Sequence, residues 1–388
     1  MNWLDAYEYA IANLQPVSGT YHDNYIVTGW HDEACLIRVP RKLLAPDVEP
    51  RMFAEPAVLQ AAQAAMVACP RLLYSSLEPE FQVHSVVPGQ PLSIALPDAG
   101  PVPAVVTAAI SELMRNLGEV AADIRPPPVP GQPWADVPAG DSAGFSDALL
   151  TWLSGIYAGA GEAARGFLSE VGIWHDPFAE VRKYFRPSPR PFRLCHGDLG
   201  RANIMLDPEG NVNFIDWELA VWGDPLWDIA AHLHRMRYPG TQNKFVRQEL
   251  LASCRGFTGL NYQYDELRTF LYVELCRSLV FDAIRDLAAI GAGLIENPAG
   301  VAAQYAAKLS QASVTSASAA GIKALYLKYG ARAPGRCEAP GNLVHTFPKR
   351  QEAQCRSRIP ASLPSGSTGT VMSTAARPST STTTGSPA

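Results

Sequence analysis

The most constraining feature of this sequence is the stretch HGDLGRANIML at residues 196–206, which lies between two short apolar runs. The first run, FRLC, ends directly before His196, and the second, NVNFI, begins at Asn211. Short apolar runs bounded by turn-forming residues are typical of buried strands. The stretch therefore predicts a polar loop that is held between two strands.

Three oxygen-bearing side chains are spaced along this region, namely Asp198, Asn203 and Asp216. A carboxylate and an amide oxygen together can hold Mg²⁺, a hard cation that prefers oxygen ligands. A further carboxylate can accept or orient the proton of a hydroxyl group. Phosphoryl transfer from a nucleotide needs this combination, because its transition state depends on positioning and charge neutralisation.

The longer stretch HGDLGRANIMLDPEGNVNFIDWELAVWGDPLWDIA resembles the signature of the aminoglycoside phosphotransferase family, which includes choline kinase-like enzymes. The positions that carry the resemblance, in order, are His196, Gly197, Asp198, Asn203, Ile215, Asp216, Trp217, Gly223, Asp224, Pro225 and Asp228. Each tripeptide alone is equally compatible with a plain turn or strand end. The ordered set is what makes the match specific.

The resemblance implies a role for each of these polar residues. Asp198 would be the catalytic base or the residue that orients the acceptor hydroxyl, and Asn203 and Asp216 would bind Mg²⁺. His196 and Asp228 would hold the catalytic loop in shape. Asp224 would cap the helix that follows, since an aspartate side chain can accept from the free N–H groups of a first helical turn.

The resemblance also assigns a nucleotide-binding role to residues before position 92. The turn in SGTYHDNYIV would cover the phosphates with Ser18, Gly19 and Asn24. Arg38 in LIRVP occupies the place where the family usually has a phosphate-contacting lysine, and its guanidinium can fork to phosphate oxygens. Glu55 is the preferred carboxylate partner of Arg38, with Glu49 as the weaker alternative.

Two further regions complete the candidate site. The resemblance places the backbone of a hinge segment against the nucleotide base, and this segment consists of Val83, His84, Ser85 and Val86. Glu274, in a long apolar helical stretch, is a candidate for binding the acceptor. The alternative for Glu274 is a pair with Arg277 on the same helix face.

The order of predicted elements indicates an α+β fold, and the resemblance implies the bilobal protein-kinase-like form. A small β-rich N-lobe is expected over residues 1–92 and a larger, mostly helical C-lobe over 93–332. Residues 333–388 are rich in Ser, Thr, Pro and Gly. Such a segment buries too little apolar surface to offset its ordering entropy, so a disordered tail is predicted.

Composition narrows the class of protein. The chain has 388 residues, 32 Lys plus Arg and 37 Asp plus Glu, for a formal charge of -5, so it carries no basic nucleic-acid-binding stripe. Its 7 scattered Cys contain no CxxC pair. No signal peptide and no long apolar run is evident. We therefore expect a cytoplasmic protein that binds neither nucleic acid nor a membrane.

The identity of the acceptor is the main open alternative. An antibiotic of the aminoglycoside type is the first interpretation, with ATP or GTP as the donor and Mg²⁺ as the cofactor. A metabolite kinase acting on an amino alcohol, homoserine or a sugar is the second. A nucleotide-binding pseudokinase is the third, although intact Asp198, Asn203 and Asp216 disfavour it. The sequence does not indicate the oligomeric state.

Overall fold

The structure is a computed structural model of the chain, which describes residues 2–17, 22–30, 32–41, 51–96, 100–120, 124–258, 263–295, 297–312 and 319–330. The chain divides into two compact units, residues 1–345 and 346–388. The predicted tail, 333–388, lies outside the described residues, as do Ser18 and Gly19.

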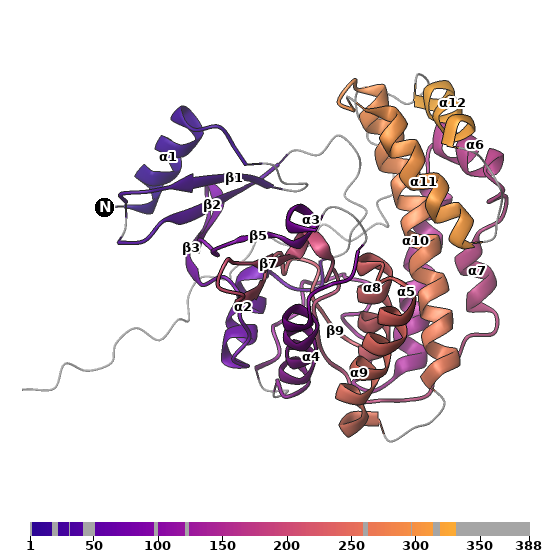
Figure 1. Cartoon of the computed structure of the whole chain (residues 1–388), viewed down its shortest axis with the longest axis horizontal. Coiled ribbons are helices and arrows are strands. Elements are labelled where there is room, and N and C mark those ends of the chain that lie inside the picture. The colour runs from indigo at the N-terminus through magenta and orange to yellow at the C-terminus, as the bar shows by residue number, and fades with distance from the viewer. Residues whose placement is uncertain are drawn as a thin grey trace, which may run out of the picture. The chain divides into compact units, whose positions relative to one another are not determined.

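Helices make up most of the region after residue 100, whereas the region before it combines a four-stranded sheet with helices α1, α2 and α3 (Figure 1). The helices are α1 (Trp3–Asn13), α2 (Glu55–Ala64), α3 (Leu92–Ala95), α4 (Ala104–Gly118), α5 (Ser142–Gly159), α6 (Glu162–Glu170), α7 (Pro177–Arg182), α8 (Pro225–Met236), α9 (Gly240–Thr258), α10 (Gln263–Gly291), α11 (Pro298–Ala312) and α12 (Ala319–Gly330). The strands are β1 (His22–Val27), β2 (Cys35–Pro40), β3 (Leu72–Leu77), β4 (Glu80–Ser85), β5 (Gln90–Pro91), β6 (Arg193–Cys195), β7 (Ile204–Leu206), β8 (Val212–Phe214) and β9 (Val221–Gly223).

The N-terminal sheet is antiparallel, with the strand order β1-β2-β4-β3. Helix α1 packs on this sheet, and its buried Ala6 and Ala10 join a hydrophobic cluster that includes Ile37 and Val83. Because successive side chains of a strand alternate between the two faces, Arg38 points to the face opposite Ile37. The sheet thus has an apolar face under α1 and a second face that carries Arg38.

Two small sheets follow and frame the HGDLGRANIML stretch. Strand β5 pairs with β7, and β7 pairs with β8, while β6 pairs with β9. Gly89 precedes β5 with a φ of +92°, and a Cβ atom there would collide with the backbone of Leu206. A glycine is therefore needed where the chain leaves the first sheet and crosses β7. This crossing fixes the segment after β4 against the loop of interest.

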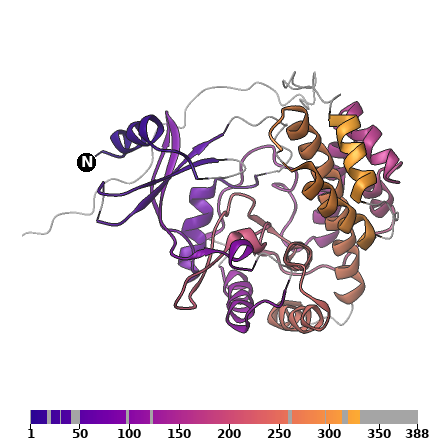
Figure 2. The same ribbon diagram turned by 45° about the horizontal axis from the view of Figure 1, so that its top comes forward.

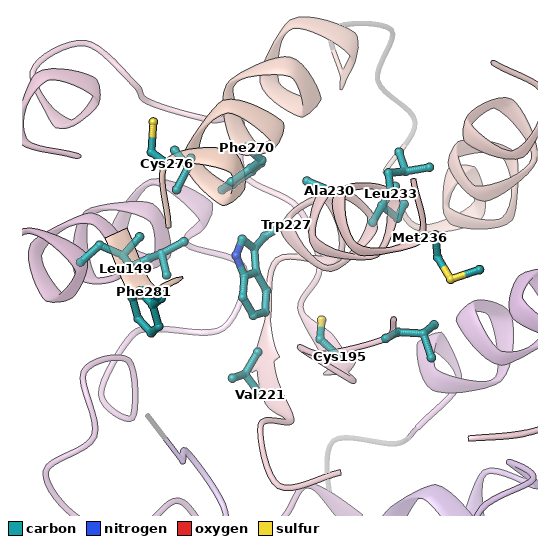
Figure 3. Packing of buried hydrophobic residues seen from close by; sticks show 14 of the residues in the cluster. Leu149, Cys195, Val221, Trp227, Ala230, Leu233, Met236, Phe270, Cys276 and Phe281 are labelled. Atoms are coloured by element: carbon teal, nitrogen blue, oxygen red, sulfur yellow. The ribbon is translucent and has the colours of Figure 1, made fainter. Parts of the chain in front are cut away.

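A large hydrophobic cluster fills the helical region, and α2 belongs to it through Val58 and Leu59. Trp227 of α8 lies within this core, with Leu149, Val221 and Phe281 around it (Figure 3). Helix α10 packs against α8, α11 and α12, and both views show α10 beside α11 (Figure 2). The core therefore holds α8 and α10 in fixed relation to each other.

The observed order, a sheet-bearing N-terminal region followed by a mostly helical one, is the α+β arrangement that the sequence predicts. Pro56 lies in the first turn of α2, where its missing N–H costs no helical hydrogen bond. The predicted strands on both sides of the loop are present as β6 and β8. The short strands β5, β7 and β9 were not predicted, and β7 lies inside the stretch that was expected to be a polar loop. The boundary at residue 92 stays a prediction.

None of the helices within the described residues combines the length and the apolar character needed to cross a lipid bilayer.

Candidate active site

The HGD turn is held by the N-terminal half of α8. The Asp228 carboxylate accepts the backbone N–H of Gly197 at 2.9 Å and that of His196 at 3.3 Å. Gly197 has a φ of +77°, a conformation that glycine adopts at little cost. Asp224 caps α8 as predicted, since its side chain accepts the Leu226 N–H at 2.8 Å. The start of α8 therefore fixes the position of the loop.

His196, the first residue of this turn, is fully buried, and its ring contacts the backbone of both Asp198 and Ile215. Its Nε2 lies 3.1 Å from the Ile215 carbonyl oxygen, and its Nδ1 lies 3.3 Å from the Asp198 backbone nitrogen. Nε2 donates and Nδ1 accepts, which requires the neutral ring. Burial lowers the pKa of His196 in agreement with this assignment. His196 thus links the loop to the residue that precedes Asp216.

Both carboxylate oxygens of Asp198 have protein partners. Oδ2 accepts from Nδ2 of Asn203 at 2.9 Å, and Oδ1 lies 2.5 Å from Nε of Arg235. Its side chain is 30 % exposed, so solvent still reaches it. The Asn203 amide uses its N–H group in this contact, which leaves its carbonyl oxygen as the atom able to bind a cation.

Asp216 lies close to Asn203 because β7 begins directly after Asn203 and its first residue, Ile204, pairs with Phe214 at the end of β8. The Ile215 N–H donates to the Asn203 carbonyl oxygen at 3.0 Å. Asp216 itself has a φ of +66°, which a non-glycine residue adopts only where the surroundings enforce it. Its side chain is 34 % exposed, and its Oδ1 accepts from NH2 of Arg38 at 2.8 Å.

The predicted ion pair between Arg38 and Glu55 is present, with 2.6 Å between NH1 and Oε1. Burial alone would lower the pKa of Arg38, but the carboxylates of Glu55 and Asp216 outweigh it and raise the pKa. Arg38 is therefore a fixed cation that joins α2 to the residue following β8. NH2 of Arg38 also lies 3.2 Å from Nδ1 of His22.

A third carboxylate, that of Glu218, lies near the same cation. Its Oε2 is 3.4 Å from Nδ1 of His22 and 3.6 Å from NH2 of Arg51. Burial, and next the charge of Asp216, raise the pKa of Glu218 to about 8. Burial lowers the pKa of His22 to about 3, so this ring is neutral. The surroundings of Arg38 therefore hold an excess of acidic groups.

The donor set at Asn203 and Asp216 fits a hard divalent cation. An amide oxygen and a carboxylate, with places left for phosphate and water oxygens, form the type of partial site that Mg²⁺ uses with nucleotides. Burial raises the pKa of Asp216, and the carboxylates of Glu55 and Asp198 add to this effect, while Arg38 opposes it. A cation there would relieve the repulsion. Among the described residues, no cluster of three His, Cys, Asp or Glu is arranged to hold a metal.

The remaining nucleotide-site candidates lie on or next to the N-terminal sheet. Asn24 pairs with Arg38 across the β1–β2 ladder, so both side chains share one face. Its Oδ1 is buried and has no hydrogen-bond partner within the described residues. The hinge candidate Val83 is a core residue under α1, whereas His84 lies on the Arg38 side. The N–H groups of Ser85 and Val86 donate to Arg71 and Ala34 carbonyls.

Glu274 is buried in the middle of α10 and has three side-chain partners. Its carboxylate accepts from Nε1 of Trp227 at 2.8 Å, from NH1 of Arg235 at 3.1 Å and from NH1 of Arg277 at 3.2 Å. Burial would raise the pKa of Glu274, but Arg277 and then Arg235 lower it overall. The alternative contact with Arg277 is thus present, and the contact with an acceptor stays a prediction.

Two residues of the site, Arg235 and His22, were not predicted from the sequence. A signal for Arg235 was present, because Asp228, His232 and Arg235 follow the i, i+4, i+7 spacing of one helix face. All three contact the same loop, with Nδ1 of His232 lying 2.9 Å from the Leu199 carbonyl oxygen. His22 carried no such signal, since its partners come from other elements.

A family model described as the phosphotransferase enzyme family matches residues 13–267, well over half of the chain. The chain belongs to this family. The matched range contains both the N-terminal sheet and the loop around Asp198. A search of curated protein sequences gave no significant match.

Several solved structures are similar to this phosphotransferase family member at low identity. The choline kinase from Streptococcus pneumoniae is 11 % identical with a TM-score of 0.47, covering 80 % of this chain and 99 % of that one. A macrolide 2'-phosphotransferase from Brachybacterium faecium is 18 % identical with a TM-score of 0.45, covering 78 % and 97 %. The GDP complex of aminoglycoside 2'-phosphotransferase-IIIa is 15 % identical with a TM-score of 0.45, covering 86 % of this chain and 99 % of that one. We draw no functional argument from these scores.

Membership of the family defines the reaction class. The protein is a small-molecule phosphotransferase that uses a nucleotide donor and an alcohol group as acceptor. Family membership does not specify the acceptor.

Proposed function

We propose that this phosphotransferase moves the γ-phosphate of ATP or GTP to a hydroxyl of a cationic antibiotic of the aminoglycoside type, in the cytoplasm. One observation carries the proposal: hydrogen bonds connect the candidate base to the candidate phosphate-binding cation. They run from Asp198 to Asn203, from the Asn203 backbone to Ile215, and from Asp216 to Arg38. The residues expected for phosphoryl transfer therefore form one connected group.

Asp198 is the residue that receives or orients the acceptor hydroxyl. It is partly exposed, and Asn203 and Arg235 restrict the rotation of its carboxylate. A carboxylate that is both accessible and fixed can hold a hydroxyl in line with the phosphate. Orientation of this kind contributes strongly to rate, because phosphoryl transfer depends mainly on positioning.

Asn203 and Asp216 hold Mg²⁺ in this proposal. Bound there, Mg²⁺ would neutralise charge on the phosphate oxygens of the nucleotide. Asp216 follows β8 by two residues in a left-handed backbone conformation, and the backbone N–H of the preceding Ile215 donates to the Asn203 carbonyl oxygen. The requirement for a divalent cation follows from the acidic character of the site.

Arg38 binds the phosphates, with Ser18, Gly19 and Asn24 nearby. Glu55 holds its guanidinium through NH1, so NH2 is the group that can pass from Asp216 to a phosphate oxygen. The free buried Oδ1 of Asn24 on the same face is available to a ligand or water. The backbone around Val83, His84, Ser85 and Val86 contacts the base in this arrangement.

A cationic acceptor is favoured by the charge of the chain. The formal charge of the chain is -5, but residues 331–388 hold 7 Lys plus Arg against 2 Glu, so residues 1–330 carry a net charge of -10. An acidic surface raises the local concentration of a cationic ligand and accelerates its association. Aminoglycosides are polycations that carry many hydroxyl groups, and they satisfy both requirements.

The proposal is tested by nucleoside-diphosphate release in the presence of Mg²⁺, with ATP and with GTP. The acceptor panel contains aminoglycosides, macrolides, choline, ethanolamine, homoserine and neutral sugars. An N-acetylated aminoglycoside, which keeps its hydroxyls and loses its charges, serves as the matched ligand control. We expect release with the aminoglycoside and at least a tenfold lower kcat/KM with its acetylated form.

The outcomes separate the alternatives. Release with choline or homoserine alone would replace the antibiotic by a metabolite as acceptor and leave the reaction unchanged. Nucleotide binding without release for any acceptor or water would favour a pseudokinase. Asp198→Ala distinguishes enzymatic release from contamination, because the release must disappear in this variant while the binding of a fluorescent ADP analogue persists.

A further inference from the structure

One face of α8 holds the catalytic loop at three successive points. Asp228 binds the backbone of the HGD turn, His232 binds the Leu199 carbonyl, and Arg235 binds the Asp198 side chain. The first two contacts go to the backbone and explain the shape of the loop. The third goes to the carboxylate that reacts in the proposed function, so it acts on the chemistry and not only on the fold.

Arg235 joins Asp198 to a buried anchor. Its Nε lies 2.5 Å from Oδ1 of Asp198, and its NH1 lies 3.1 Å from Oε2 of Glu274. The Glu274 side chain is only 1 % exposed and is itself held by Trp227 and Arg277. Trp227 in turn lies within the hydrophobic core (Figure 3). The position of Arg235 is therefore set by residues that cannot easily move.

The catalytic loop leaves space for this side chain. A Cβ atom on Gly200 would lie 3.1 Å from Cβ of Arg235, which is tighter than most packing contacts, and 3.5 Å from its Cδ, an ordinary contact distance. Gly200 has a φ of −116°, which any residue can adopt. The glycine at this position is thus explained by the passage of the arginine and not by backbone strain.

The two contacts of Asp198 fix the plane of its carboxylate. Asn203 holds Oδ2 and Arg235 holds Oδ1, so rotation about Cβ–Cγ breaks both. The remaining lone pairs are then presented in one direction. In a loose transition state, the orientation of the hydroxyl matters more than the strength of the base.

We infer that Arg235 is a positioning residue for phosphoryl transfer, which orients the Asp198 carboxylate from a buried anchor at Glu274. The inference rests on the proposed function, because it assumes that Asp198 meets the acceptor hydroxyl. It also links α10 to the reacting carboxylate through α8.

The role requires an arginine. Its guanidinium contacts Asp198 through Nε and Glu274 through NH1, and the fixed fork holds both contacts in one geometry. A lysine ammonium is a single point charge on a flexible stem and cannot reproduce both contacts. The kcat of Arg235→Lys should therefore lie between that of the wild type and that of Arg235→Met.

The experiment measures kcat and KM for nucleoside-diphosphate release. The acceptor is the member of the panel that gives the highest rate, or water if no member of the panel is phosphorylated. We expect kcat to fall by about 100-fold in Arg235→Met and about tenfold in Arg235→Lys, with KM for the nucleotide within about threefold of the wild type. Gly200→Ala should lower kcat by a smaller factor. Added guanidinium ion should restore part of the rate of Arg235→Ala.

Arg190→Lys is the matched control. Arg190 is buried and also bridges two carboxylates, those of Asp224 and Glu266. It has no contact with Asp198 among the described residues. We expect Arg190→Lys to lower Tm at least as much as Arg235→Lys while kcat below the transition stays within about twofold. A general loss of stability would affect kcat equally in both variants and would contradict the inference.

A double-variant cycle tests the path through Glu274. If Glu274 acts through Arg235, Glu274→Gln lowers kcat in the wild type but causes no further loss in Arg235→Met. Fully additive losses would overturn the anchoring role.

Asp198→Ala separates this inference from the function on which it rests. Loss of release in Asp198→Ala, with kcat unchanged in Arg235→Met, would overturn the inference alone. Release that persists in Asp198→Ala, or a wild type that releases no diphosphate, would overturn both.

Discussion

Arg38 and Arg235 each join a buried glutamate to a partly exposed aspartate of the candidate active site. Arg38 connects Glu55 of α2 to Asp216, and Arg235 connects Glu274 of α10 to Asp198. The glutamate side chains are 3 % and 1 % exposed, whereas the aspartate side chains are 34 % and 30 % exposed. The same arrangement thus occurs on the nucleotide side and on the acceptor side.

The two arrangements differ in how completely the anchor is held. All partners of Glu274 come from α8 and α10, which pack closely in the helical core. Glu55 has one buried oxygen, Oε2, without a hydrogen-bond partner among the described residues. Arg38 also reaches across 178 residues of sequence to Asp216. The acceptor side is therefore the more firmly fixed of the two.

This difference matches the two tasks in the proposed reaction. Arg38 must exchange its contact with Asp216 for a phosphate oxygen when the nucleotide binds. Arg235 keeps its contact with Asp198 throughout, because its task is to hold the carboxylate still. A side chain that must change partners benefits from a less saturated anchor than one that must not move.

The largest expected effect separates Asp198 from the residues that hold it. Asp198→Asn keeps the size of the side chain and removes its charge, so we expect kcat to fall by about 1,000-fold, within the range for loss of a general base. A steady-state assay of nucleoside-diphosphate release measures this decrease in kcat directly. Asp147→Asn is the control, since Asp147 forms an exposed pair with Arg182 at 2.7 Å, and its kcat should not change.

The second prediction distinguishes the two arginines. Arg38→Met removes a cation that would contact the phosphates. Loss of such charge-assisted contacts corresponds to a Kd for the nucleotide that is about 100-fold higher. Titration with a fluorescent ADP analogue measures the change. Arg235→Met should leave this Kd within about threefold.

Arg38→Lys is the conservative control for that titration and should recover most of the affinity, because a lysine also carries the charge to the phosphates. Equal effects of Arg38→Met and Arg235→Met on nucleotide affinity would break the proposed division between the nucleotide side and the acceptor side.

The third prediction concerns the acid stability of the α8 contact with the loop. Burial lowers the pKa of His232 to about 4, so the folded protein holds this ring neutral while the unfolded chain protonates it below about pH 6.5. The stability due to the neutral ring is present above pH 6.5 and is lost as the pH falls towards 4. Between pH 7 and pH 5 this corresponds to about 2 kcal/mol.

Urea unfolding at pH 7 and pH 5 tests this dependence. His232→Gln keeps groups that can bond the Leu199 carbonyl and the Tyr238 hydroxyl. It should therefore lose less stability than the wild type over the same interval. The same loss in both proteins would show that other buried histidines account for the acid sensitivity.

The smallest effect compares two buried carboxylates of α10. Burial raises the pKa of Asp286, and the neighbouring Asp282 adds to this, so its ionisation destabilises the fold at pH 8. The cost disappears as the pH falls below the folded pKa. We expect Asp286→Asn to raise the free energy of unfolding at pH 8 by about 1 kcal/mol, because the Tyr326 hydroxyl can still donate to the amide oxygen.

Glu274→Gln is the opposite case on the same helix. Arginines lower the pKa of Glu274, so loss of its charge should decrease the free energy of unfolding at pH 8. Urea unfolding of both variants at pH 8 and pH 4 measures the signs. Two changes of the same sign at pH 8 would contradict the assignment of Glu274 as a charged anchor.

Local features of the sequence predicted the elements that carry the site. The pattern of apolar runs placed strands on both sides of the loop. This feature depends on neighbouring residues, because strand patterning acts over a few positions. The ion pair of Arg38 with Glu55 was predicted from the family resemblance and not from such local patterns.

Contacts between distant segments escaped prediction for a physical reason. The spacing of Asp228, His232 and Arg235 marked one helix face, but nothing in the spacing shows what that face contacts. Whether Arg235 meets Asp198 depends on how α8 packs against the loop and against α10. The roles of the site residues themselves stay predictions until the assays are done.

The sequence by itself determined the change from a strand-bearing to a helical region, the polar segment after β6, the family of the protein and, through the family resemblance, the pairing of Arg38 with Glu55. Only the tertiary structure decided that Arg38 also faces Asp216 and that Arg235 faces Asp198. Short-range propensities are written in adjacent residues, whereas the pairing of Arg38 with Asp216 and of Arg235 with Asp198 arises when buried apolar surfaces bring separate elements together. The same packing brings together charged side chains that are far apart in the sequence.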